Sequence, residues 1–295
     1  GAVISVVCAL LLCWASLCWA LDAGLQHYLE TGEPGNWPFG AGRERGAALF
    51  AQGRASLAAG DTATARQALE QLTRSGSGPW TAAAWGLLAE CALADDRLDE
   101  ASACLDQVRR QAAQTARWTR LRQAELQYFQ GKFKEAAAQL EELARQDPAD
   151  PSANDALVLL GLIERYQENA GQLQIFARAQ LRLRQGREAA QEWAQLEAGG
   201  GLQDLSLLTQ ARWQAGRDPA AALLLYQRFS AQFPKSTYAP EAQLEAAALH
   251  EAGGELAEAL AAYEAALSRF PDDARLPEVR LHIQRLRRQS PGGGG

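Results

Sequence analysis

Histidine is rare in this chain of 295 residues, and the sequence patterns that bind metals or nucleotides are missing. The three histidines, His27, His250 and His282, are far apart, and none has a histidine, cysteine or carboxylate at metal-ligand spacing on the same face. The glycine run at 199–201 lacks the lysine and hydroxyl residue of a phosphate-binding loop, and no G-x-S-x-G turn occurs. We therefore expect no metal site, no cofactor and no enzymatic activity.

A basic surface and long β-branched runs are also missing. The net charge is −6, which argues against nucleic-acid binding because that function requires a basic stripe. No alternating β-branched run predicts a sheet, and the residues that dominate after position 43 favour helices. Only three of the 29 basic residues are lysines, a bias typical of GC-rich bacterial genomes. The expected fold class is all-α.

Charge is absent from the first 21 residues, which are largely apolar and about enough to span a bilayer. Cys18 and Ala20 are small residues at the two positions that a signal peptidase reads, which favours export with cleavage after Ala20. A retained membrane anchor and a buried helix are the alternatives. With either of the first two interpretations, the N-terminus enters a membrane at least transiently.

Two cysteines lie outside this apolar segment, Cys91 and Cys104. Their helices are predicted to be neighbours, so an oxidising compartment would permit a disulfide between them. Two buried thiols are the alternative, because cysteine is among the residues most often found in protein cores. The sequence leaves both interpretations open.

Helical hairpins of similar sequence follow one another from Gly46. The pattern is clearest in Pro240–Pro271, where Gly253 and Gly254 separate two apolar-periodic runs. Small residues let the two helices approach closely, and a glycine accepts the left-handed conformation that ends the first helix. The turn residues of the earlier copies are Gly60, Asp96, Gly131, Gly186 and Gly216. Such a hairpin cannot bury its apolar face alone and needs copies on either side.

These copies resemble the tetratricopeptide repeat, a pair of antiparallel helices of about 34 residues. The resemblance covers roughly Gly46–Gln289 and implies a right-handed α-solenoid of about six hairpins, with Leu276–Gln289 as a capping helix. The apolar residues 1–21 predict an N-terminal hydrophobic helix in front of it. The stretches YQRFSAQFPKSTYAPEAQ and ALSRFPDDARLPEV resemble a repeat subtype of bacterial cell-envelope proteins. The implied role is a non-catalytic scaffold for protein interactions.

The predicted organisation has four parts. Residues 1–21 are a signal peptide or membrane anchor, residues 22–45 a short helix and a Gly/Pro linker, residues 46–290 the solenoid, and residues 291–295 a disordered tail. The gap between Gly131 and Gly186 is longer than one repeat. We therefore expect an inserted helix near residues 155–168, followed by a fourth hairpin over residues 172–197.

The resemblance also implies a concave groove, lined by fixed positions of the first helix of each hairpin. In this chain these positions are Phe50, Arg54, Leu57, Gly86, Glu90, Leu93, Trp118, Leu121, Glu125, Tyr128 and Phe129. Three aromatic residues fall in the third hairpin, which predicts an anchor pocket for an extended or helical peptide. The alternative is that the inserted helix folds over this face and buries the aromatic side chains.

The leading expectation for function is a protein-interaction scaffold of the bacterial envelope, periplasmic or membrane-anchored and facing the periplasm. It would bind a protein or peptide partner in the groove and no nucleic acid. The alternative is a structural subunit that is packed permanently within a larger membrane-associated complex.

Overall fold

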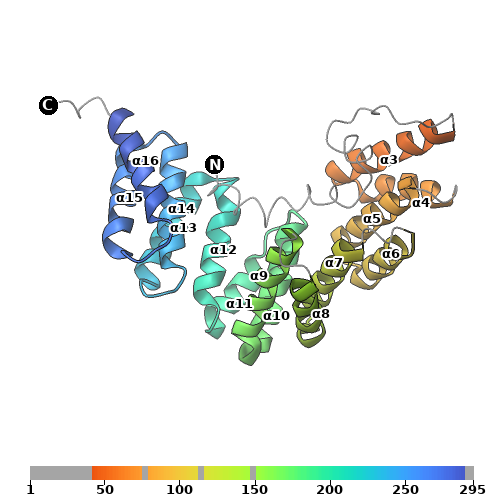
Figure 1. The fold of residues 1–295 in the computed structure, drawn as a ribbon, viewed down its shortest axis with the longest axis horizontal. Helices are drawn as coiled ribbons and strands as arrows, with labels where there is room; N and C mark the ends of the chain where they lie inside the picture. The colour runs from red at the N-terminus through yellow and green to blue at the C-terminus, as the bar shows by residue number, and fades with distance from the viewer. Residues whose placement is uncertain (1–41, 75–78, 112–115, 147–150, 290–295) are drawn as a thin grey trace. The chain divides into compact units, whose positions relative to one another are not determined.

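The computed structural model describes residues 42–74, 79–111, 116–146 and 151–289, and all regular structure within these ranges is helical (Figure 1). The N-terminal hydrophobic helix, most of the linker before α3 and the C-terminal tail of the sequence predictions lie outside the described residues. Among the helices in these ranges, none combines the length and the apolar character needed to cross a bilayer. The chain divides into two compact units, with the boundary between Glu188 and Ala189.

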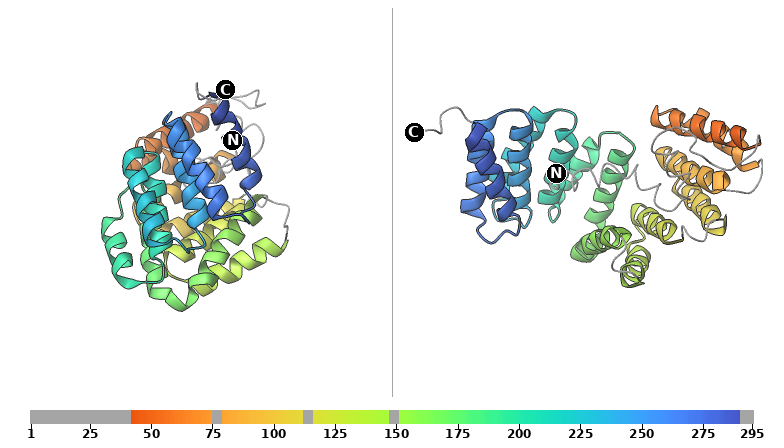
Figure 2. Two further views of the ribbon diagram at one scale, coloured as in Figure 1. Left: turned by 90° about the vertical axis from the view of Figure 1, so that its left-hand side faces the viewer. Right: turned by 45° about the horizontal axis from the view of Figure 1, so that its top comes forward.

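Helical hairpins stacked in chain order make up most of the first unit (Figures 1 and 2). The pairs are α3 (Gly42–Ala58) with α4 (Thr62–Arg74), α5 (Pro79–Ala94) with α6 (Leu98–Gln111), and α7 (Ala116–Phe129) with α8 (Phe133–Gln146). The unit continues with α9 (Pro151–Tyr166), the short 3₁₀ helix η3 (Gln167–Asn169) and α10 (Ala170–Arg184). Because α9 packs on α8, it continues the stack.

A left-handed residue ends the first helix of each of these hairpins. The φ angles are +80° at Gly60, +65° at Asp96 and +77° at Gly131. In the second hairpin the Arg97 N–H donates to the Ala92 carbonyl at 2.8 Å, which pairs a carbonyl that the helix end would leave open. Aspartate accepts the left-handed conformation more readily than most residues. The turn predicted at Asp96 therefore forms without a glycine.

Small residues bring the two helices of a hairpin into contact. Gly53 of α3 is the closest case, since a Cβ atom at this position would lie 2.6 Å from Cγ of Leu69 in α4. Ala65 of α4 and Ala136 of α8 are both fully buried. The pattern of small residues in the sequence thus corresponds to the sites of closest helix approach.

The connection between α9 and α10 differs from the hairpin turns. Tyr166, which precedes η3, and Asn169, its last residue, have φ angles of −113° and −109°. No left-handed residue is present here, and α10 packs against α7 as well as against α9 and η3. The helix predicted near residues 155–168 is α9, and it begins earlier, at Pro151.

The fourth hairpin predicted over residues 172–197 does not form as expected. Its two helices are present, but α10 belongs to the first unit, whereas α11 (Ala190–Gly199) belongs to the second. The left-handed Gly186, with φ of +74°, ends α10, and three further residues precede α11. Helix α11 packs on α12.

The second unit continues with stacked helical pairs. They are α12 (Gln203–Ala215) with α13 (Pro219–Gln232), and α14 (Ala239–Ala252) with α15 (Leu256–Arg269); α16 (Leu276–Gln289) packs against α15. The Asp218 carboxylate accepts a hydrogen bond of 3.0 Å from the Ala221 N–H, and Pro219 occupies the first turn of α13, where its missing N–H costs nothing.

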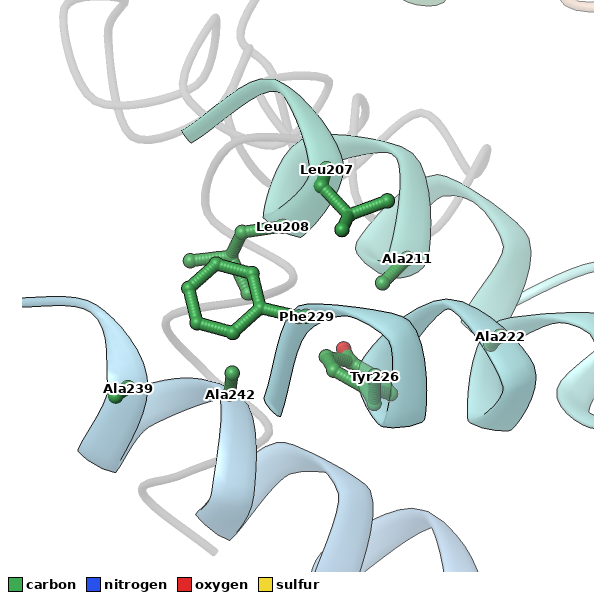
Figure 3. Close-up of a cluster of buried hydrophobic side chains, with 8 residues drawn as sticks. All are labelled: Leu207, Leu208, Ala211, Ala222, Tyr226, Phe229, Ala239 and Ala242. Carbon is green, nitrogen blue, oxygen red and sulfur yellow. The ribbon is translucent and has the colours of Figure 1, made fainter. Parts of the chain in front are cut away.

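Figure 3 shows the apolar core between α12, α13 and α14. The Phe229 ring of α13 lies near Leu208 of α12 and Ala242 of α14, and all three side chains are fully buried. Tyr226, one helical turn earlier, is also buried in this cluster. A second core lies among α14, α15 and α16, around Tyr263 and Ile283.

Candidate protein-interaction site

Several residues predicted to line the groove are instead part of the core of the first unit. The Phe50 side chain is fully buried, with its ring centroid 5.4 Å from that of Trp80. Leu121 and Phe129 are also buried, and Phe129 lies against Tyr128 at 5.6 Å between ring centroids. The apolar atoms of Phe50, Leu121 and Phe129 thus pack within the unit, and their role as partner contacts stays a prediction.

Other predicted positions are only partly covered or lie outside the description. Arg54 and Leu57 of α3 are half-buried, whereas Gly86 and Leu93 of α5 are buried. Trp118 lies in the first turn of α7, and its side chain is outside the described part of the structure.

Tyr128, Glu90 and Glu125 converge on α10. The Tyr128 hydroxyl donates a hydrogen bond of 2.7 Å to Oε1 of Gln180. Burial raises the pKa of Tyr128, so its hydroxyl remains a protonated donor. The predicted aromatic anchor is therefore covered by the chain itself: α10 bonds to Tyr128, and both α9 and α10 pack on α7.

Arg184 of α10 bridges two hairpins of the first unit. One guanidinium nitrogen donates to Glu125 of α7 at 3.1 Å, and another donates to Glu90 of α5 at 3.0 Å. Arg122 of α7 also donates to Glu125, at 2.7 Å. We call these four residues, Glu90, Arg122, Glu125 and Arg184, the charged cluster. They help to line a cavity of only about 10 Å³, room for one water at most.

The charges of the cluster stabilise one another. Burial alone would raise the pKa of Glu125, but the guanidinium groups of Arg122 and Arg184 outweigh it and hold that pKa below its ordinary value. The same contacts raise the pKa of Arg184, because the attraction of Glu90 and Glu125 outweighs the desolvation of the cation. Glu125 is therefore ionised at neutral pH.

The end of α10 is also attached to α5. The Gln185 side chain donates to the Leu93 carbonyl at 2.8 Å, and Arg187 donates to the Ala94 carbonyl at 3.3 Å. These carbonyls lie in the last turn of α5, where acceptors remain available, and the Leu93 carbonyl also accepts from the Asp96 N–H at 3.1 Å. Side chains from residues 180–187 thus contact the groove positions of the second and third hairpins.

Sequence reasoning missed the α10 side chains, Gln180 and Arg184, and also the buried Arg122. The signal that could have indicated an unusual placement of α10 is the long gap before Gly186. This gap does not give the direction in which α10 folds back, because that depends on a contact between residues 94 positions apart.

No other chemical centre is evident in the described ranges. Among these residues, no three histidine, cysteine or acidic side chains are placed to hold a metal ion. Cys91 and Cys104 are buried and free.

Three family models, each described as a tetratricopeptide repeat, match this chain, at residues 56–124, 121–174 and 240–288. Curated protein sequences give no match. Among solved structures, the crystal structure of the P58(IPK) TPR domain is similar, with 16% sequence identity and a TM-score of 0.36, over 84% of this chain and 67% of that chain. The family matches lie in both compact units. The chain is a tetratricopeptide-repeat protein.

Proposed function

We propose that this protein is a non-catalytic scaffold of the bacterial envelope that binds a helical segment of a partner protein through the groove positions of its first unit. Tetratricopeptide repeats support the scaffold role, because the stacked hairpins expose long surfaces for other chains. The envelope location is inferred from the apolar residues 1–21.

One observation supports this groove in particular. Glu90 and Glu125, from successive hairpins, both bind the Arg184 guanidinium, so the two positions form a receptor for a cation carried by a helix. Both carboxylates are partly exposed, with 24% and 18% of their side-chain surface accessible. Solvent therefore reaches the cluster even with α10 bound.

Site-specific crosslinking in cells that express the protein naturally tests the groove. A photoreactive amino acid replaces Arg54 in one variant and the exposed Glu135 of α8 in a control variant. We expect a discrete protein adduct from position 54 and none of the same mass from position 135. Adducts from position 135 alone would contradict binding at the groove.

The proposed export has its own test, which is the N-terminal residue of the mature protein. Mass spectrometry of protein isolated from the envelope fraction should find Leu21 as the first residue. An intact N-terminal segment in a membrane fraction would instead support the anchor, and recovery in the cytosol would contradict the envelope location.

An uncovered apolar face on α9 favours a second candidate, a subunit packed permanently in a larger membrane-associated complex. Leu157 and Val158 are 53% and 58% exposed, and the neighbouring Gly161 has open space beside it. Exposed aliphatic clusters are typical of surfaces that other proteins cover. Substituting serine for both residues should leave the isolated protein folded and prevent its co-purification with a complex.

A further inference from the structure

We propose that α10 is a built-in ligand of the groove, and that the external partner is an amphipathic helix of the same chemistry that takes its place. This inference rests on the proposed function and specifies both the partner and the control of access. It starts from the contacts between residues 180–187 and the groove positions of α5 and α7.

Polar side chains have a large part in the contact between α10 and the groove. Its described hydrogen bonds use Gln180, Arg184, Gln185 and Arg187. Polar contacts of this kind are typical of interfaces that form and separate. The desolvation of Arg184 and its two carboxylates offsets much of their attraction, so the charged cluster contributes more to specificity than to stability.

The buried apolar side chains of α10 indicate which apolar surface a partner helix needs in order to replace it. Leu173, Phe176 and Ala177 are fully or almost fully buried, and Leu181 and Leu183 are also buried. Release of α10 into water would expose these side chains, so the open state is rare in the resting protein. A partner helix therefore needs an apolar stripe as well as an arginine that reaches Glu90 and Glu125.

Attachment to the same chain makes α10 a strong competitor. A tethered helix acts at an effective concentration on the order of millimolar. The apparent affinity of an external helix then equals its intrinsic affinity multiplied by the fraction of molecules in the open state. Substitutions confined to α10 should raise the affinity of the groove for an external helix without changing the groove itself.

The test uses a fluorescent peptide of residues 170–187 as the probe and the full chain as the receptor, with binding followed by anisotropy. The receptor variant Phe176→Ala/Arg184→Ala carries its changes in α10 alone. We expect it to bind the peptide at least about 10-fold more tightly than the wild type, because its own α10 competes less well. Equal binding by the two receptors, with the variant still folded by circular dichroism, would overturn the proposal.

Substitutions in the receptor and in the peptide test whether the peptide binds at Glu90 and Glu125. Adding Glu90→Gln/Glu125→Gln to the receptor variant should remove the gain, as should Arg184→Ala within the peptide, since the charge-assisted contacts account for about 10-fold or more in affinity. The control peptide carries Arg178→Ala, at an exposed position of α10, and should bind as the parent does. If Arg178→Ala weakened peptide binding as much as Arg184→Ala does, the contact would be non-specific and the proposal would be wrong.

Hydrogen exchange on the wild-type chain gives a second measurement that does not require a destabilised variant. Saturating peptide should accelerate exchange in residues 170–184 and leave α5 and α7 protected. Unchanged exchange in α10 at saturation would rule out displacement. If these peptide experiments fail while crosslinking still finds a groove partner, α10 is not a built-in ligand but the proposed function stands. If the peptide experiments succeed while crosslinking finds no groove partner, α10 is a ligand of the groove but the proposed function is wrong.

Discussion

At the scale of single residues, two glycines within helices have opposite roles. Gly53 lies where α3 meets α4, and an added Cβ would approach three carbon atoms of Leu69 at 2.6 to 3.2 Å. Gly161 lies in the middle of α9 with nothing within 4 Å of the same position. The residue type is the same, but only the first is required for packing.

Replacing each glycine with alanine should separate these roles. Gly53→Ala should destabilise the protein by about 1 kcal/mol, since overpacking costs about 1–3 kcal/mol and higher helix propensity returns about 1. Gly161→Ala should stabilise it by about 0.5–1 kcal/mol. Urea unfolding followed by circular dichroism measures both variants. A stabilising Gly53→Ala would show that Leu69 repacks freely.

At the scale of elements, the most informative feature is the position of α10 over α5 and α7. Arg184 connects the three helices through Glu90 and Glu125. Arg184→Ala should destabilise the first unit by about 1.5–3 kcal/mol, the range for hydrogen bonds to charged groups. Arg178→Ala, on the exposed face of the same helix, is the control and should change the free energy of unfolding by less than about 0.5 kcal/mol. Equal effects of the two substitutions would contradict the contact.

The effect of Arg184→Ala should depend on pH. Because the pKa of Glu125 is held below its ordinary value, this carboxylate stabilises the folded state above the unfolded pKa and loses that contribution as the pH falls through the folded pKa. Without Arg184 the pKa of Glu125 rises, so the stability difference between wild type and variant should be largest at neutral pH and shrink below about pH 4. Denaturant titrations at pH 7 and at about pH 3.5 compare the two. A pH-independent difference would show that packing, and not charge, causes the loss.

The hairpins could be predicted from the sequence, whereas the filling of the groove could not. Local sequence features predict the hairpins: small residues mark where the helices approach closely, and Gly60, Asp96 and Gly131 mark the turns. The resemblance to the tetratricopeptide repeat implied that Glu90, Glu125 and Tyr128 line one groove, and in the structure all three bond to side chains of α10. The packing of Trp80 beside Phe50 could not be predicted, because the position of Phe50 on its helix does not show which side chain lies next to it.

At the scale of the whole molecule, the second compact unit contains apolar cores of its own. Phe229 is fully buried in the core of the second unit, and its replacement by alanine should cost about 3–5 kcal/mol. Hydrogen exchange should then accelerate within residues 189–289 and remain near wild type within residues 42–188. Acceleration throughout both ranges would show that the units unfold together.

Thiol labelling reports on the first unit in the same way. Burial raises the pKa of Cys91 and of Cys104 to about 11, so only about one thiol in a thousand is ionised at pH 8. Peptide-resolved mass spectrometry after treatment with a maleimide should find both residues unmodified in the folded protein and modified in urea. Phe229→Ala should not increase their labelling, whereas rapid labelling of the native wild type would contradict the burial of these thiols.

The bridge from Arg184 to Glu90 has a mechanical consequence. Most contacts within the two units join neighbouring helices, and a stack of that kind gives way to tension one hairpin at a time. The Arg184 contact instead joins residues 94 positions apart and encloses α6, the third hairpin and α9 within one loop of chain. When the first unit is stretched from its two ends, it should therefore resist extension until the ion pair between Arg184 and Glu90 breaks, and then lengthen in a single large step.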